Sequence, residues 1–323
     1  MPLKTLRKSE VWVVGGSNMD ISAQTPTALL RGDSTPGQLT CSPGGVARNV
    51  AENLARLGVP THLIGVVGDD VFGQRLRQGT AVAGVMVEAL LTLPSQRTAS
   101  YLSLLGPDGD MALAVNDMDI LAHLTPDLLR RFAPQLSQAV CWVVDCNLAA
   151  PALQWLFDNA CQTPIFVDAV SVAKCGKLLP WLGHIHALKV NQFEAQALSD
   201  LPAATVFEAQ AAALRLHQLG ACQVVVSLGA QGVCWCDAQG QVGHRAAGQV
   251  GVVNTTGAGD ALLAGLVHGH VCHLPLPEAL EFALACADLT LASPFANAPG
   301  LCTEAVYSRV ALSRSFHSSP ASQ

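Results

Sequence analysis

The stretch Asn254-Thr255-Thr256-Gly257-Ala258-Gly259-Asp260 combines small residues with a single acid where a helix is expected to begin. It follows the apolar run 248–253 and leads into the strongly helical segment 261–267. The amino end of a helix offers unpaired N–H groups and about half a positive charge, and small residues let a ligand approach the backbone. This stretch therefore predicts an anion site.

Asp260 lies in the first turn of that helix, where its carboxylate would repel an anion but would stay ionised. A carboxylate beside an anion hole is useful when a hydroxyl must lose its proton as a phosphoryl group arrives. The hole would hold the charge of the transferring group, and Asp260 would accept the proton. The alternative is a capped helix after a glycine turn, in which Asp260 only stabilises the helix dipole, by about 0.3–1 kcal/mol.

Two polar side chains follow the first predicted strand, Val11–Val14. Asn18 and Asp20 are two residues apart, so in extended chain they point the same way, and ligands of open α/β sheets bind at this edge. The pair suits gripping neighbouring hydroxyls, and a local turn made by either side chain is the alternative. The spacing is not the G-x-G-x-x-G of a dinucleotide site, which argues against a dehydrogenase.

The segments that must position these residues alternate strand and helix. The paired glycines Gly44-Gly45 open a helix that ends at Gly58, and further strands are expected at 61–67, 140–144, 165–168, 185–190 and 224–227. Such alternation predicts a parallel sheet. A hairpin over 98–116 interrupts it, which with residues 21–41 predicts a small β lid over the ligand edge.

Two later segments suggest a nucleotide site. Asn191 and Glu194 share one face of a helix start, where an amide and a carboxylate could hold a hydrated Mg²⁺; a capping box is the alternative. The turn after Ser227 could carry phosphates or could be only a hairpin into the next strand. The Ala-rich helix expected over 280–292 could leave room for a flat base.

Composition narrows the function classes. The chain has 323 residues, half of them hydrophobic, and a net charge of −6, which disfavours a nucleic-acid surface. No apolar run reaches membrane-spanning length, and residues 1–10 lack the apolar core of a signal peptide, so we expect a cytoplasmic protein without a membrane partner. The 11 cysteines are expected to be reduced thiols. The Ser-rich end, 313–323, is expected to be disordered.

Taken in order, these motifs resemble the PfkB/ribokinase family of carbohydrate kinases over residues 10–310. The segment 15–20 resembles the family's N-terminal substrate strand, and Gly44-Gly45 with Asn49 resembles its first signature. Asn191-x-x-Glu194 resembles its Asn-x-x-Glu motif, and Gly257-Ala258-Gly259-Asp260 its second signature. Within the family the chain is most similar to bacterial pseudouridine kinases, a similarity that rests on residues 44–49, 100–105, 115–118, 145–147 and Asn254.

The resemblance implies a single α/β domain over 1–323, ribokinase-like and Rossmann-like, with a mostly parallel central sheet and a β lid from about 18–42 and 96–118. It implies ATP-dependent phosphorylation of the 5′-hydroxyl of pseudouridine, with Mg²⁺, by a homodimer formed through the lid. Another nucleoside or sugar, such as adenosine or ribose, is the nearest alternative, and a non-catalytic ligand-binding regulator is the next. Ribokinases proper usually carry at position 254 an Asp that contributes to a monovalent-cation site, so Asn254 argues against K⁺ activation.

The resemblance also assigns roles residue by residue. Asp260 would be the base, and the N–H groups of Gly257, Ala258 and Gly259 would form the anion hole. The expected substrate contacts are Asn18, Asp20, Gly44, Gly45 and Asn49, with Asn116, Asp117 and Asn147 as further ribose or uracil contacts. Expected at the nucleotide are Asn191, Ser227, Gly229, Gly232 and Thr256, with Glu194 as the Mg²⁺ residue.

Overall fold

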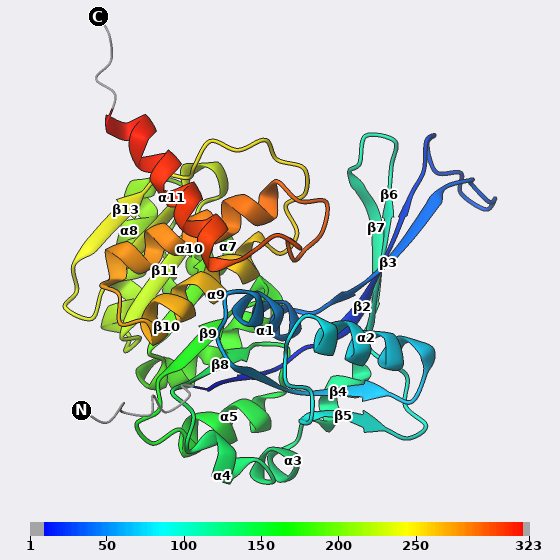
Figure 1. The fold of residues 1–323 in the computed structure, drawn as a ribbon, viewed down its shortest axis with the longest axis horizontal. Helices are drawn as coiled ribbons and strands as arrows, with labels where there is room; N and C mark the ends of the chain where they lie inside the picture. Colours follow the sequence, from blue (N-terminus) through cyan, green and yellow to red (C-terminus); the bar gives the residue numbers. More distant parts are fainter. Residues whose placement is uncertain (1–9, 319–323) are drawn as a thin grey trace, which may run out of the picture.

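The computed structural model describes residues 10–318 (Figure 1). Residues 1–9, in the segment judged to lack a signal peptide, and residues 319–323, in the tail predicted to be disordered, lie outside the described residues. The chain forms a nine-stranded main sheet and a separate four-stranded sheet. This is the ribokinase-like α/β fold with a lid that the sequence predicts.

The main sheet is parallel except at one edge. Its strands, in spatial order, are β13 (Val242–Arg245), β12 (Val233–Cys236), β11 (Gln223–Ser227), β10 (Ala187–Asn191), β9 (Ile165–Asp168), β8 (Cys141–Asp145), β1 (Val11–Val14), β4 (Thr61–Gly68) and β5 (Leu90–Leu93). All neighbours from β11 to β5 pair parallel, whereas β12 pairs antiparallel with both β11 and β13. The carboxyl ends of the parallel strands therefore share one edge, where polar residues follow the strands.

Helices cover both faces of this sheet. Successive strand residues point to opposite sides, so a strand of apolar residues places apolar side chains on both faces. Trp12 and Val14 join one hydrophobic core, and Val11 and Val13 join the other. The first core includes residues of α3 (Pro126–Arg130), α4 (Ala133–Leu136), α5 (Ala150–Asn159), α7 (Gln192–Ser199) and α8 (Val206–Gln218). The second includes residues of α1 (Val46–Arg56), α2 (Val71–Val82), α9 (Ala258–Val271) and α10 (Leu276–Leu291).

Short helical segments complete the described chain: η1 (Asp119–His123), α6 (Val172–Cys175), η2 (Gly176–His184) and η3 (Gly229–Gln231). The last helix, α11 (Thr303–Ser318), includes residues 313–318, for which the Ser-rich composition predicted disorder. Val306 and Val310 bury their side chains in a cluster with Phe282 of α10, which anchors the helix. This packing lies in the part of α11 before residue 313, and the helix continues from it to Ser318.

The lid sheet projects away from the main sheet as two strand pairs (Figure 1). Its strands, in spatial order, are β3 (Gln38–Gly44), β2 (Asn18–Gln24), β6 (Ser100–Leu105) and β7 (Met111–Asp117). Asp20 pairs in register with Ser42 and Tyr101, and Tyr101 pairs with Asn116. Because residues in register share a face, these four side chains lie on one side of the lid.

Two further expectations from composition can be compared with the structure. All 11 cysteines are free thiols. No helix within residues 10–318 has the length and apolar character needed to cross a membrane.

Candidate active site

The amino end of α9 begins at Gly257, which adopts a left-handed conformation with φ 82°. A side chain at this position would collide with the carbonyl of Ala296, so glycine is required by both conformation and space. No side chain of the described residues caps this helix end. Its first N–H groups and the positive end of the helix dipole therefore face outward as a place for an anion.

Asp260 sits in the first turn of α9 and is 9 % exposed. Its Oδ2 accepts a hydrogen bond of 2.8 Å from Nδ2 of Asn49 in α1. Burial, with the nearby negative charge of Asp168, raises the pKa of Asp260 to about 7, although Asn49 and Lys189 oppose the shift. A carboxyl group with a pKa near neutrality is a suitable general base at physiological pH.

Lys189, in the middle of β10, is a functional candidate that sequence reasoning missed. Its Nζ lies 3.0 Å from Oδ2 of Asp168, and a side chain on Gly259 would collide with it. Burial alone would lower the pKa of Lys189, but Asp168, Asp260 and Glu194 together raise it above its usual value. A buried ammonium group is therefore held charged beside the amino end of α9, where it adds to the attraction for an anion.

The structure places the two polar residues predicted to follow the first strand in β2 of the lid, close to α1. Nδ2 of Asn18 donates to Oδ1 of Asp20 at 2.6 Å, so the two side chains share a face as expected. A Cβ on Gly44 would overlap the Asp20 carboxylate, so that carboxylate lies directly on the backbone that opens α1. The backbone N–H of Asn49 bonds to the carbonyl of Gly45 at 2.8 Å. Asp20 and Asp260 thus flank the first turn of α1. Burial raises the pKa of Asp20, partly offset by Asn18.

A buried carboxylate, Asp145 at the end of β8, holds these segments together. Its Oδ2 accepts from the N–H of Gly16 at 2.9 Å and from the N–H of Ala47 at 3.0 Å, and its Oδ1 accepts from the N–H of Asn147. Asn147 also donates to Asp145 through Nδ2 and accepts 2.6 Å from Nζ of Lys174. A Cβ on Gly16 would collide with Nδ2 of Asn147, so Asn147 lies against the turn between β1 and β2.

The lid places its two candidate residues differently. Asn116 lies on the same face as Asp20, because both are in register with Tyr101. Asp117 follows it in β7 and points the other way, where its Oδ2 pairs with the exposed Arg97 at 3.0 Å. Only Asn116 therefore faces the same side as the polar end of β2.

Asn191 and Glu194 form a complete capping box at the start of α7, the alternative raised for them from the sequence. Oε2 of Glu194 accepts from the N–H of Asn191 and Oε1 accepts from its Nδ2, both at 2.8 Å. Glu194 is almost fully buried, and burial raises its pKa. Within residues 10–318 no group of three His, Cys, Asp or Glu side chains is arranged to hold a metal directly. Each Glu194 oxygen keeps a second lone pair, so the carboxylate could accept from a water of a hydrated Mg²⁺.

The expected nucleotide residues follow neighbouring strands at the same edge. Ser227 pairs in register with Asn191, and the turn that begins at Gly229 and ends at Gly232 leads into β12. A side chain on Gly232 would meet the chain at 245–247. That chain borders a cavity of about 340 Å³, whose lining includes Ala246, Gly248, Leu284, Ala285 and Asp288. The backbone N–H of Thr256 is bound to Oδ1 of Asn254 at 2.9 Å.

Comparison with known proteins places this geometry in a family. Residues 8–301 match the model of the pfkB family carbohydrate kinases. The chain is 39% identical over 303 residues to pseudouridine kinase from Escherichia coli (strain K12), covering 94% of this chain and 97% of that protein.

Two solved structures agree in fold. A ribokinase from Arabidopsis thaliana complexed with ribose and ATP gives a TM-score of 0.85 at 21% identity, covering 94% of this chain and 98% of that one. A putative ribokinase II from E. coli in complex with ATP and Mg²⁺ gives 0.80 at 19%, covering 94% and 99%. The chain therefore belongs to the PfkB family of carbohydrate kinases, the ATP-dependent kinases of sugars and nucleosides.

Proposed function

We propose that this protein transfers the γ-phosphoryl group of ATP to the 5′-hydroxyl of pseudouridine. One observation carries the chemistry: Asp260, with its pKa raised to about 7, stands at the open amino end of α9 and bonds to the helix that opens beside Asp20. The choice of pseudouridine is supported by the 39% identity to the E. coli enzyme. We expect the enzyme to work in the cytoplasm.

In the proposed reaction, Asp260 accepts the proton of the 5′-hydroxyl as that oxygen attacks the γ-phosphorus and the bond to the β-phosphate oxygen breaks. The N–H groups of Gly257, Ala258 and Gly259 stabilise the charge that spreads over the transferring group. The ammonium group of Lys189 adds a second positive charge beside them. Most of the rate then comes from positioning and electrostatics, and the base contributes a factor of about 10²–10⁴.

We assign the sugar contacts to the polar end of β2 and the start of α1. Asn18, Asp20 and Asn49 would bind ribose hydroxyls, while Gly44 and Gly45 let the sugar approach the backbone. Asn116 on the lid and Asn147 against the turn between β1 and β2 are proposed contacts to ribose or uracil. We leave Asp117 out of these contacts, because its carboxylate pairs with Arg97 on the opposite face of the lid.

The nucleotide would lie along the edge formed by the ends of β10 and β11. Asn191, Ser227, Gly229, Gly232 and Thr256 are the proposed contacts, and the cavity beside α10 has room for a base. Glu194 would hold Mg²⁺ through water, because its two oxygens already accept from Asn191. A bound Mg²⁺ would neutralise phosphate charge at this position.

A panel of acceptors with ATP tests the proposal, with ADP release as the readout and mass determination of the product. Pseudouridine should give the highest kcat/KM among pseudouridine, uridine, adenosine and ribose. A higher value for another acceptor would assign that substrate instead. No ADP release with any acceptor would favour the ligand-binding regulator, an alternative that the retained Asp260 and Glu194 argue against.

We also propose a homodimer formed through the lid. Apart from the Asp117–Arg97 pair, the face opposite Asp20 carries exposed apolar side chains: Leu39 is 73 %, Leu113 57 % and Val115 58 % accessible. A contiguous apolar face on a small sheet that also has open edges is expected to be covered by a partner. A second copy is the occupant we propose, because its lid carries the same apolar face and the same open strand edges.

The oligomeric state of two matched variants tests the dimer. Leu113→Lys should shift the mass measured by light scattering from dimer to monomer. Phe207→Lys is the control, because Phe207 is 81 % exposed on α8, away from the lid. A wild-type monomer, or a Leu113→Lys variant that stays dimeric, would reject the lid interface.

A further inference from the structure

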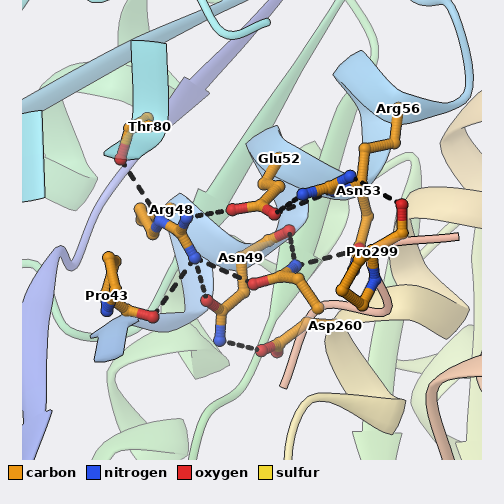
Figure 2. Close-up of polar contacts among 10 residues, drawn as sticks. Pro43, Arg48, Asn49, Glu52, Asn53, Arg56, Thr80, Asp260 and Pro299 are labelled. Carbon is orange, nitrogen blue, oxygen red and sulfur yellow. Dashed lines mark hydrogen bonds and ion pairs between the residues drawn. The ribbon is translucent and has the colours of Figure 1, made fainter. Parts of the chain in front are cut away.

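A buried polar network surrounds Arg48 in the first turn of α1 (Figure 2). Arg48 is 4 % exposed, and its guanidinium pairs with Glu52, which also binds Arg56. The same guanidinium donates to Thr80 Oγ1 at 3.2 Å, to the Pro43 carbonyl at 3.2 Å, to Asn49 Oδ1 at 3.1 Å and to Asn297 Oδ1 at 2.8 Å. A side chain held by this many hydrogen bonds has a fixed position. The reaction proposed above gives Arg48 no role that would account for these bonds.

The contact with Asn49 is the one that reaches the reacting groups. The amide of Asn49 has an oxygen that only accepts and a nitrogen that only donates. Its oxygen faces Arg48, and its nitrogen faces Oδ2 of Asp260 at 2.8 Å (Figure 2). If the amide turned over, its oxygen would face the Asp260 carboxylate, and two acceptors would meet.

Asn297 binds the same guanidinium nitrogen of Arg48, Nη1, that donates to Asn49. Its Oδ1 accepts from Arg48, and its Nδ2 donates to the Asn49 carbonyl and to Asn53 Oδ1, both at 2.9 Å. The preceding residue, Ala296, lies against Gly257 at the amino end of α9. The segment between α10 and α11 therefore touches both the anion site and the residue that orients Asn49.

We propose that Arg48, held by Asn297, is a positioning residue that keeps the NH₂ group of Asn49 aimed at the carboxylate of Asp260. This inference rests on the proposed function, in which Asp260 is the base. Arg48 does not need to contact the substrate for this role. Its hydrogen bond decides which end of the Asn49 amide the base meets.

The orientation of the Asn49 amide therefore affects the protonation equilibrium of the Asp260 carboxyl group. The charged groups that act on it are Asp168 and Asp145, which favour the protonated form, and Lys189, which favours the carboxylate. The Asn49 N–H also favours the carboxylate, so losing it must raise the pKa of Asp260 further. At neutral pH a larger fraction of the enzyme would then carry a protonated base that cannot accept a proton.

The decisive experiment is a carbon-13 NMR titration of the Asp260 carboxyl group, assigned with Asp260→Asn, in wild type and in Arg48→Met. Arg48→Met should move the titration midpoint upward by about one pH unit, or about tenfold in the protonation equilibrium. Arg48→Lys keeps a donor at this position, so its titration midpoint should stay close to the wild-type value. This readout needs no substrate, so it separates the positioning role from the identity of the acceptor, which the acceptor panel tests.

Two further variants keep the experiment decisive. Asn297→Ala removes a second acceptor of Arg48 Nη1 and should shift the midpoint in the same direction by a smaller amount, even if Arg48→Met fails to fold. Arg56→Gln is the control: it loses contacts to Glu52 and to the Pro299 carbonyl but has none with Asn49, so the midpoint should stay at the wild-type value. Folded Arg48→Met or Asn297→Ala with a wild-type midpoint would overturn the proposal.

Discussion

The close packing of Asp20 on Gly44 allows a test of the sugar site by a single added methyl group. A Cβ at position 44 would overlap the Asp20 carboxylate, and Gly44 has no left-handed backbone conformation that alanine would strain. Gly44→Ala should therefore push the carboxylate away from its place without a direct effect on the backbone. Asp260 and the nucleotide edge should not be affected.

The size of the effect follows from what Asp20 is proposed to do. Hydrogen bonds between a charged group and a ligand hydroxyl contribute about 1.5–3 kcal/mol, which corresponds to a change in binding of about 10- to 150-fold. Gly44→Ala should raise the KM for the nucleoside by that range and leave the KM for ATP unchanged. Adding Asp20→Ala to Gly44→Ala should cost little more, because both changes remove the same contact.

Steady-state kinetics with both substrates varied measures these values. Gly183→Ala is the matched control, because a Cβ there meets nothing within 4 Å. It should leave both KM values unchanged. A Gly44→Ala enzyme with the wild-type KM for its nucleoside would show that Asp20 does not bind the sugar.

Three other predictions follow from the charges at the site. Because Asp260 must be ionised and its pKa is about 7, kcat should fall about tenfold per pH unit below 7; a flat acid side would contradict this. Lys189→Met should cut kcat by about 10²–10³, because it removes a positive charge from the phosphoryl site. It should also move the acid side of the pH profile of kcat to higher pH, because that charge favours the Asp260 carboxylate; an unmoved profile would refute this. The Asn254 amide donates to the Pro294 carbonyl at 3.1 Å, at a position where an aspartate would favour a cation. The wild-type rate should therefore not depend on K⁺, whereas Asn254→Asp should be activated by K⁺. A wild-type enzyme that needs K⁺ would contradict this.

Much of the fold could be predicted because its signals are local. Buried strands ending in polar residues, such as Val11–Val14 before Asn18, indicate a parallel sheet and its ligand edge. The hairpin at 106–109 and the small residues before Asp260 are equally local. Such local features therefore predict the sheet, the lid and the amino end of α9.

The residues that sequence reasoning missed depend on distant contacts. Lys189 is a single lysine in an apolar run, and only the packing of α9 places it against Gly259. Arg48 lies within the 44–49 motif, but its partner Asn297 is 249 residues away, so the sequence gives no sign of their contact. The face that Asp117 occupies is set by the register of β7 with β6, which the hairpin length alone does not determine.

The most direct test of the account is the turnover of Asp260→Asn with ATP and the acceptor that the wild type prefers. The amide keeps the shape and the neighbours of the side chain but cannot accept the proton. We predict a kcat lower by about 10²–10⁴ with nearly unchanged KM values, because the base acts in the transition state rather than in binding. A variant that retains near-wild-type kcat would contradict the assignment of Asp260 as the base.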